Sequence, residues 1–318
     1  MSGKPIFLCP GQGAQAVGMG KAWFDASPDA ARTFGAADEI LGDRLGAKLS
    51  DLCFTGPDDQ LNRTDVAQPA LYVCGVASFQ AAFGHLDGSE IAATAGLSLG
   101  EYTALHIARS ISFEDGLNLV ALRGKAMQEA AEAYDSSMVA LNGADEEQAR
   151  ALCDDVVAAG ESSWVLVPAN FNAPGQVVVS GSEAACDAAV ELASGRGLRA
   201  TKLSVAGAFH SPLMEPAAQR LREAFDGVSI AEPSCPVVSN VTGGPHGPEG
   251  DKPVSETIRD RLVRQLTAPV RWEQDCRWLL EKFGPDAAYH ELAPGKVLMG
   301  LMRRIDRGTK VITHDQPA

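Results

Sequence analysis

A serine flanked by glycines is the residue of this chain best placed for nucleophilic chemistry. Ser98 is the centre of Gly96-Leu97-Ser98-Leu99-Gly100, which matches G-x-S-x-G between a short apolar run and a helical pattern. Glycines on both sides allow a sharp strand-to-helix turn that projects the hydroxyl, and the N–H of Leu99 would point at the same spot from the start of the helix. An ordinary turn with a capping serine is the alternative, but the position between strand and helix favours a nucleophile.

A serine hydroxyl needs a base to take its proton, and the chain contains six histidines. We expect His246 in an exposed loop, His85 at a helix end, and His106 beyond the serine and pointing elsewhere. His210 lies between a small inserted unit and a new helix, where side chains from two units would face one cleft. A histidine that only caps the following helix fits the residues equally well, so the pattern leaves both interpretations open.

A lone arginine in an apolar helical pattern is the candidate for binding an anion. Arg123 is surrounded by Leu119, Val120, Ala126 and Met127. Such an arginine usually extends its guanidinium to solvent. A guanidinium held near the nucleophile would instead suit a carboxylate, which it can bind through two parallel hydrogen bonds.

A glycine-rich loop follows the first predicted strand. Gly11-Gln12-Gly13 lacks the third glycine of a dinucleotide-binding loop and the Lys-Ser or Lys-Thr of a Walker loop, which argues against nucleotide binding. A loop at the carboxyl end of a strand can still direct a backbone N–H at a developing oxyanion. The N–H of Gln12 is the candidate.

The composition of the chain argues against some classes of binding partner and indicates the redox state of its compartment. The 318 residues include 27 Lys and Arg against 41 Asp and Glu, a formal charge of −14, which argues against nucleic acid and anionic membranes as general partners. Seven cysteines contain no CxxC pair of the kind that zinc and redox sites use, and an odd count suggests a reducing compartment. No apolar run reaches the length of a signal-peptide core or of a membrane span. We therefore expect a cytoplasmic protein without a metal site.

The hydrophobic pattern predicts an α/β protein built of two units. Between residues 136 and 205 the expected order is strand, helix, strand, strand, helix, strand, which is the ferredoxin-like arrangement. We expect this small unit to be inserted into a large unit with a parallel sheet, made of residues 1–135 and 206–318. Expected elements of the large unit include strands at Pro5 to Cys9, Ile91 to Ala95, Pro236 to Val241 and Ala288 to Leu292, and helices at Ala67 to Phe83, Phe113 to Ala131, Ser255 to Leu266 and Val297 to Arg304.

Taken together, the motifs resemble those of the malonyl-CoA:acyl carrier protein transacylases and the related acyltransferase domains of fatty acid and polyketide synthases. The resemblance spans nearly the whole chain, and its segments occur in the same order. They are Pro10 to Gln15, Gln68 to Ala70, Gly96 to Tyr102, Arg123 to Lys125, Asn170 to Gln176, Phe209 to Ser211, Gln265 to Leu266 and Pro294 to Leu298. A joint match of this extent is far more specific than G-x-S-x-G alone.

The resemblance implies a large α/β-hydrolase-like unit and a ping-pong transfer of malonyl from malonyl-CoA to the phosphopantetheine thiol of acyl carrier protein, in fatty acid synthesis and without a further cofactor. Ser98 would carry the malonyl group, His210 would move the proton, and Arg123 would hold the malonyl carboxylate. The backbone carbonyl of Gln265 would orient His210. The other implied site residues are Gln12 and Leu99, whose N–H groups would form the oxyanion hole, and Gln68, Met127, Asn172 and Phe209, which would line the pocket.

Two positions depart from the pattern of the family. Leu97 stands where many members carry histidine, so any assisting role of that histidine is absent. A residue at this position that points away from the pocket could vary freely. Ser136-Ser137-Met138 stands where glycine is usual, which affects the local turn.

Other functions compete with this interpretation. A stand-alone polyketide synthase acyltransferase with another extender unit is the nearest, although Phe209 before the histidine resembles malonyl-selective members. A serine esterase of the α/β-hydrolase fold would need His290 or His314 as its base. A non-catalytic docking component that keeps the fold would not need Ser98, His210 and Arg123 intact.

The charge of the chain also bears on its expected partner. Acyl carrier proteins are acidic as a family, so docking on a chain of charge −14 requires a local basic surface near the cleft. Two clusters are candidates, and each could also be an ordinary solvated face. The first is Arg303, Arg304 and Arg307, and the second is Arg196, Arg199 and Lys202.

Overall fold

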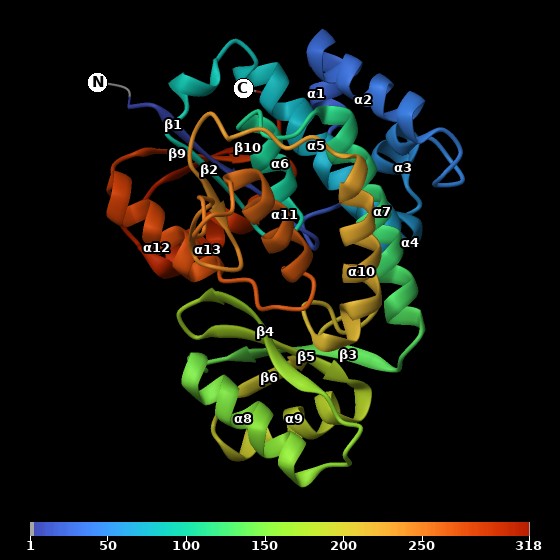
Figure 1. The fold of residues 1–318 in the computed structure, drawn as a ribbon, viewed down its shortest axis with the longest axis vertical. Helices are drawn as coiled ribbons and strands as arrows, with labels where there is room; N and C mark the ends of the chain where they lie inside the picture. Colours follow the sequence, from blue (N-terminus) through green and yellow to red (C-terminus); the bar gives the residue numbers. More distant parts are fainter. Residues whose placement is uncertain (1–2, 318) are drawn as a thin grey trace.

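A mostly parallel sheet organises the larger part of the molecule. The computed structural model describes residues 3–317. The strands of the large sheet, in spatial order, are β10 (Val311–His314), β9 (Ala288–Leu292), β1 (Pro5–Cys9), β2 (Ala93–Gly96), β7 (Val237–Ser239) and β8 (Gly244–Pro245). The first five pair in parallel, and β8 adds an antiparallel edge. The expected fold class, α/β with a parallel sheet and a second small sheet, is confirmed (Figure 1).

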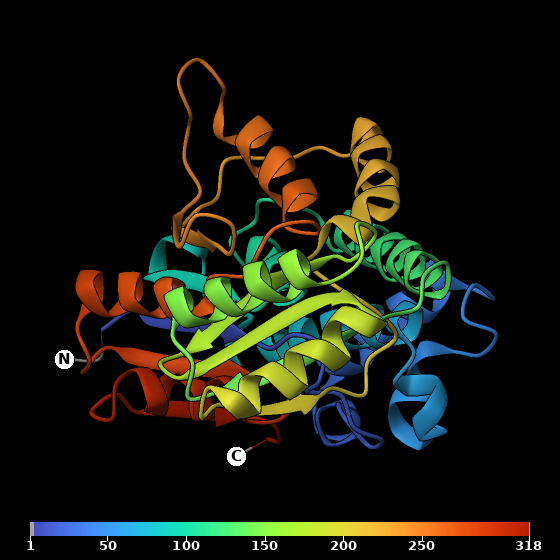
Figure 2. The same ribbon diagram turned by 90° about the horizontal axis from the view of Figure 1, so that it is seen from below.

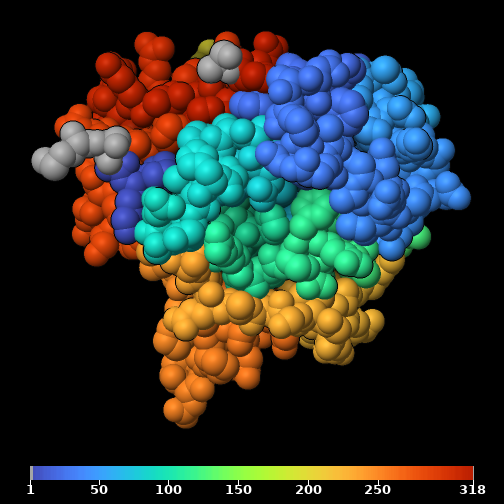
Figure 3. Space-filling model, turned by 90° about the horizontal axis from the view of Figure 1, so that it is seen from above, coloured from blue at the N-terminus to red at the C-terminus, as the bar shows by residue number. Residues whose placement is uncertain are grey.

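Helices cover both faces of the large sheet. They are α1 (Lys21–Ala26), α2 (Pro28–Leu41), α3 (Leu49–Thr55), α4 (Asp58–Leu61), α5 (Thr64–Phe83), α6 (Gly100–Ile107), α7 (Phe113–Glu132), α10 (Glu215–Ala224), α11 (Val254–Arg264), α12 (Trp272–Phe283) and α13 (Val297–Ile305). Alternate residues of β1 enter different cores, as the period of a strand requires. Phe7 packs in the core that contains α5 and α7, whereas Leu8 packs in the core of α12 and α13. Seen from above, the segments that carry α2 to α7, coloured blue to green, occupy the centre and right of the visible face (Figure 3).

The helix α5 is long and apolar enough to cross a membrane by length and composition alone, with a mean hydropathy of 1.2 in its most apolar window. In the structure, 78% of that window is buried inside the molecule. Its sides contact α2, α6 and α7, so it is the central helix of the large core.

The small unit has the expected ferredoxin-like order. Its sheet is antiparallel in the order β4-β5-β3-β6. The bounds of its elements are β3 (Ser136–Asn142), α8 (Glu146–Ala159), β4 (Leu166–Ala173), β5 (Gln176–Ser182), α9 (Glu183–Gly195) and β6 (Arg199–Lys202). The two helices lie side by side on one face of this sheet (Figure 2) and enclose a separate hydrophobic core. The limits of the unit at residues 136 and 205 stay a prediction.

Several elements begin or end elsewhere than the pattern predicts. The helix α5 starts at Thr64 rather than Ala67, because the N–H of Ala67 already bonds the carbonyl of Arg63, and Pro69 therefore lies inside the helix. The last strand of the small sheet ends at Lys202, since the next residues leave the sheet to line a cavity. The strand β10 and the helices α2 to α4 are not among the elements that were predicted from the sequence.

The turn after β2 depends on a close backbone approach at Gly96. A Cβ atom added there would lie 1.9 Å from the carbonyl carbon of Gly100, where nothing can move aside without opening the turn. Only glycine fits this packing of strand end against helix start. The turn that carries Ser98 is therefore built on the absence of a side chain at residue 96.

We expect Gly96→Ala to lower the free energy of unfolding by about 3 kcal/mol or more, because overpacking against backbone cannot relax. The matched control is Gly300→Ala in α13, where an added Cβ meets nothing within 4 Å and alanine should favour the helix by about 1 kcal/mol. Urea unfolding of both variants measures the difference. Equal effects of the two substitutions would contradict the packing argument.

Candidate functional site

Ser98 occupies a strained turn between β2 and α6. Its φ of 51° lies in the left-handed region, which costs free energy for a residue with a side chain and is common at functional sites. The backbone N–H of Ser98 donates to the side-chain oxygen of Asn240 at 2.6 Å. This bond holds the strained turn in place from the neighbouring strand β7.

Ser98 and His210 are within hydrogen-bond distance despite a separation of 112 residues in the chain. Ser98 Oγ lies 2.9 Å from His210 Nε2, and His210 Nδ1 lies 2.7 Å from the backbone oxygen of Gln265. A carbonyl oxygen only accepts, so Nδ1 carries the proton and donates it to Gln265. In the neutral ring, Nε2 then presents its lone pair to the serine hydroxyl, which is the arrangement of a general base.

The surroundings of His210 favour this neutral ring. Burial, followed by the charge of Arg123, lowers the pKa of His210 to about 4, against the raising effect of the Gln265 carbonyl. His210 also has a positive φ of 57°. No carboxylate among residues 3–317 contacts the ring, and a carbonyl occupies the position that an acid takes in a Ser-His-Asp triad.

Arg123 reaches the same site from α7 and does not extend to solvent. The residue is 1% exposed, and its Nη2 donates to Ser98 Oγ at 3.0 Å and to Gln265 Oε1 at 3.0 Å. Its Nη1 donates to Gln68 Oε1 at 2.6 Å. No Asp or Glu of residues 3–317 forms an ion pair with Arg123, and its buried Nε has no acceptor. A buried guanidinium held only by neutral groups favours binding of an anion beside the serine.

Two residues with free backbone N–H groups line the cavity together with Ser98. Gln12 lies in the loop after β1 and Leu99 at the start of α6, and both line the same cavity as Ser98. Within residues 3–317 neither N–H donates to a protein acceptor. The loop lies close because Gly11 lacks a side chain: a Cβ there would be 2.2 Å from the carbonyl oxygen of Leu97. The placement suits an oxyanion hole.

A cavity of about 630 Å³ opens between the large and small sheets. Its lining includes Met127, Asn172 and Phe209, as the resemblance implies, and also Leu97, so this position does not point away from the pocket. The remaining expected lining residue, Gln68, is absent from the wall. It is fully buried, and its Oε1 accepts a hydrogen bond from the guanidinium of Arg123.

The sequence analysis missed a buried polar network beneath the turn. His246 Nε2 donates to Glu101 Oε1 at 2.7 Å, so the expectation that His246 lies exposed is wrong. Its loop folds back, because the N–H of His246 bonds the carbonyl of Val237. Glu101 Oε2 accepts from Gln265 Nε2 at 2.7 Å and from the N–H of Asn240 at 3.1 Å. The sequence does contain one sign of this network, which is the charged residue Glu101 at the start of α6, within the Gly96 to Tyr102 segment.

The other end of the network is an acid on α12. Asn240 Nδ2 donates to the carbonyl of Gly96 and to Asp275 Oδ2, both at 2.8 Å. Burial, followed by the nearby charge of Glu101, raises the pKa of Asp275 well above its usual range. Asn240 therefore contacts both sides of the turn, Gly96 before the serine and Ser98 itself.

The histidines that an esterase would need lie elsewhere. His290 Nδ1 is 2.9 Å from His314 Nε2, and the two rings stack on the neighbouring strands β9 and β10 against Phe83. Neither residue lines the cavity. The geometry therefore places His210 beside Ser98, and not His290 or His314.

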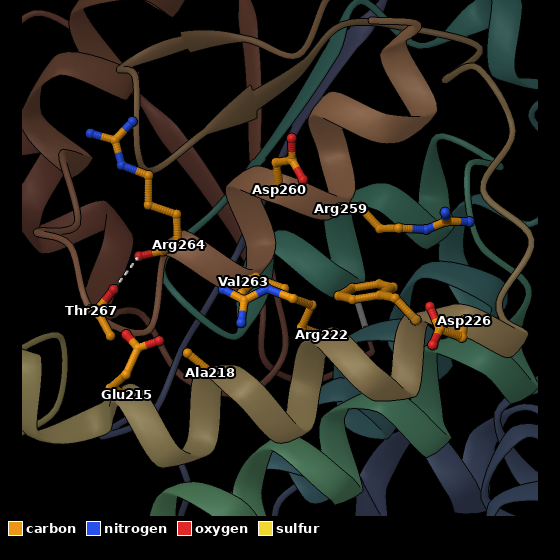
Figure 4. A pocket seen from close by; sticks show the side chains of 10 residues that line it. Glu215, Ala218, Arg222, Asp226, Arg259, Asp260, Val263, Arg264 and Thr267 are labelled. Carbon is orange, nitrogen blue, oxygen red and sulfur yellow. Dashed lines mark hydrogen bonds between the residues drawn. The ribbon is translucent and has the colours of Figure 1, made fainter.

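A second hollow, of about 360 Å³, lies between α10 and α11 (Figure 4). Arg222, Arg259 and Arg264 line it together with Glu215, Asp226 and Asp260. None of the residues around Ser98 is among its lining. Because basic and acidic side chains both line this hollow, its charge favours neither an anionic nor a cationic ligand.

Comparison with known proteins agrees with this site. A family model described as acyl transferase domain matches residues 6–294. A malonyl CoA-acyl carrier protein transacylase of Bacillus subtilis is 39% identical over 315 residues, which cover 99% of this chain and 94% of that protein.

Solved structures give the same result. The crystal structure of a malonyl-CoA:acyl carrier protein transacylase from Xanthomonas oryzae has a TM-score of 0.88 and 40% identity, with 100% and 96% of the two chains covered. A malonyl-transacylase solved in complex with a type II polyketide synthase acyl carrier protein has a TM-score of 0.86 and 34% identity, with 99% and 96% covered.

The position of His210 predicts how the reactivity of Ser98 depends on pH. Because the ring must be unprotonated to accept the serine proton, and its pKa is lowered to about 4, the rate of reaction with a small uncharged fluorophosphonate should stay constant from about pH 8 to pH 5 and fall only below. Mass spectrometry of the labelled chain measures the rate. Circular dichroism at each pH shows that the fold persists.

His210→Ala is the control, and it should slow labelling by about 10²–10⁴-fold at every pH. An acid limb between about pH 6 and 7, where an ordinary histidine titrates, would contradict the assignment of a buried neutral base.

Proposed function

The chain belongs to the acyl transferase domain family, and on this premise we propose that it transfers the malonyl group of malonyl-CoA to the phosphopantetheine thiol of acyl carrier protein. Ser98 carries the malonyl group between two half-reactions. Each half-reaction breaks one bond from the acyl carbon to oxygen or sulfur and forms another in its place. The chemistry therefore needs a nucleophile, a base and an oxyanion site.

In the first half-reaction, Ser98 Oγ attacks the thioester carbonyl while His210 Nε2 takes its proton. The 2.9 Å contact between these atoms supports direct transfer. The developing oxyanion faces the N–H groups of Gln12 and Leu99. The imidazolium that forms stays hydrogen-bonded to the Gln265 carbonyl, and returns its proton to the leaving thiolate of coenzyme A.

The second half-reaction uses the same groups in reverse order. The pantetheine thiol gives its proton to His210 Nε2 and attacks the ester carbonyl. The tetrahedral intermediate then collapses, and Ser98 Oγ leaves and takes the proton back. The low pKa of His210 means that the ring begins each half-reaction neutral.

The observation that carries the choice of malonyl is the buried guanidinium of Arg123. It lies 3.0 Å from Ser98 Oγ and has no carboxylate partner among residues 3–317. A malonyl group on Ser98 brings a carboxylate three bonds beyond the ester oxygen, within reach of this cation. An acetyl group leaves the cation unpaired, which makes acetyl the poorer substrate.

Two further assignments follow the same proposal. Transfer for fatty acid synthesis is favoured over service to a polyketide synthase by the transacylase relatives, although one relative acts with a polyketide carrier protein. The cytoplasm is the proposed location, because all seven cysteines are free and buried, as suits a reducing compartment.

Arg123→Ala should lower the rate of malonyl transfer from malonyl-CoA to Ser98 by on the order of 10²-fold, because two charge-assisted hydrogen bonds to the carboxylate are lost. Acetyl-CoA should acylate the variant as fast as the parent chain or faster. Intact-mass analysis after rapid quenching, with a panel of acyl-CoAs, measures both rates.

Ser98→Ala controls for the site of labelling and should show no acyl adduct at all. Arg123→Lys keeps the charge without the planar fork and should recover only part of the malonyl rate. Equal losses for malonyl and acetyl would show that Arg123 is structural. A preference for a larger acyl-CoA would favour the polyketide acyltransferase with another extender unit.

A further inference from the structure

We propose that Asn240, the residue after β7, is a positioning residue that keeps Ser98 Oγ aimed at His210 Nε2, and that Asp275 on α12 acts through it by holding the Asn240 amide in one orientation. Both side chains are fully buried behind the turn, and neither lines the cavity. The inference rests on the proposed function, because it concerns the same nucleophile. It adds two residues that touch neither substrate nor base.

The turn at Ser98 depends on support from outside its own backbone. A φ of 51° is unfavourable for a residue with a side chain and persists only where the surroundings hold it. Among residues 3–317 no backbone oxygen accepts from the N–H of Ser98, which donates to Asn240 Oδ1 at 2.6 Å. On the other side of the turn, the carbonyl of Gly96 accepts from Asn240 Nδ2 at 2.8 Å. One amide therefore joins the two sides of the turn.

The neighbours of Asn240 fit only one orientation of its amide. Oδ1 faces two donors, the N–H of Ser98 and Nε2 of Gln265, the latter at 3.2 Å. Nδ2 faces two acceptors, the carbonyl of Gly96 and Asp275 Oδ2, both at 2.8 Å. A half-turn of the amide would set donors against donors and acceptors against acceptors. Asp275 thus opposes the orientation in which the N–H of Ser98 loses its acceptor.

The backbone of Asn240 is fixed as well. Its N–H donates to Glu101 Oε2 at 3.1 Å, and its carbonyl accepts from the N–H of Arg271 at 2.9 Å. With both backbone groups and both side-chain groups bonded, the residue has no polar atom free to rearrange. Ser98 is therefore held in line with His210 before any substrate binds, which matters because a shift of about 1 Å in a reacting group can cost 10²-fold in rate.

The first test replaces the amide in Asn240→Ala. Two reactions of Ser98 are followed on the intact chain: labelling by a small uncharged fluorophosphonate, and single-turnover malonylation over a range of malonyl-CoA concentrations. Each gives a rate constant and the fraction of chains that finally react. The control is Thr94→Val, which removes a buried 3.1 Å hydrogen bond from β2 to the carbonyl of Ala104 in α6 and leaves the turn untouched.

Asn240→Ala should lower both rate constants by about 10²-fold, because the serine hydroxyl is no longer held in line with the base. The concentration of malonyl-CoA for half-maximal rate should change by less than about threefold, since the bond of Arg123 to Gln68 remains. Thr94→Val should keep both rate constants within about twofold of the parent. A purely structural role would instead lower the fraction that reacts and leave the rate constant of the remainder unchanged.

The second test leaves Asn240 in place and changes its partner. Asp275→Asn still offers an oxygen to Asn240 Nδ2, so its labelling rate should lie within about threefold of the parent. Asp275→Leu removes that acceptor and should slow labelling by about tenfold. Circular dichroism shows that each variant is folded. This pair tests the proposal even where Asn240→Ala does not fold.

Four outcomes would overturn the inference. They are parent-like rate constants in Asn240→Ala, an equal loss in Thr94→Val, a loss confined to malonylation, which would place the effect on the substrate, and equal rates in the two Asp275 variants. Failure of the proposed function is distinct from these, because the parent chain would then be labelled by the fluorophosphonate but not malonylated.

Discussion

A guanidinium buried without a carboxylate is the constraint on which the site depends. Arg123 is almost fully enclosed, yet the groups that hold it are a serine hydroxyl and two amide oxygens. Burial of a charge in this way costs several kcal/mol unless hydrogen bonds and a counter-ion compensate. The protein supplies the hydrogen bonds, and in the proposed function the substrate supplies the counter-ion. Selectivity for an acyl group with its own negative charge would follow from that arrangement.

Gln265 connects this cation to the rest of the machinery. Its side-chain oxygen accepts from Arg123, and its side-chain nitrogen donates to the carbonyl of Ser98 and to Glu101. Its backbone oxygen accepts from His210. One residue at the end of α11 therefore contacts the guanidinium of Arg123, the turn that carries Ser98 and the ring of His210. Because these groups share bonds, substitutions among them should not act additively.

The sequence predicted the parts of the site that local patterns encode. Glycines around Ser98 indicate a tight turn, and the joint motifs bring His210, Arg123 and Gln265 into one resemblance. The structure places all four in contact, while their catalytic roles stay predictions. Gln68 was expected in the cavity wall and lies behind it, because whether a side chain reaches a cavity depends on tertiary packing that spacing does not contain. The same limit hid the contact of His246 with Glu101, since a polar stretch rich in glycine and proline reads as exposed even where one residue folds back.

In the fold, too, local patterns were predictable from the sequence, whereas features set by tertiary packing were not. The alternation of Ile6, Phe7 and Leu8 between two cores follows from strand geometry, and the order of the small unit was predictable from its periodicity. Element ends were not, because Pro69 inside α5 and the short β6 are set by neighbouring segments. The pairing of Lys202, in the second basic cluster, was also invisible in the sequence, since the acids that neutralise it are fifteen and nineteen residues away and reach it only across the folded small unit.

The most direct measurement of the central claim is a crystal structure of the chain with a malonyl ester trapped on Ser98. The account predicts that the malonyl carboxylate lies about 2.7–2.9 Å from two nitrogens of Arg123, with the contact between Arg123 Nη2 and Ser98 Oγ replaced. A carboxylate that points out of the cavity toward solvent, with Arg123 still bonded only to Gln68 and Gln265, would contradict it.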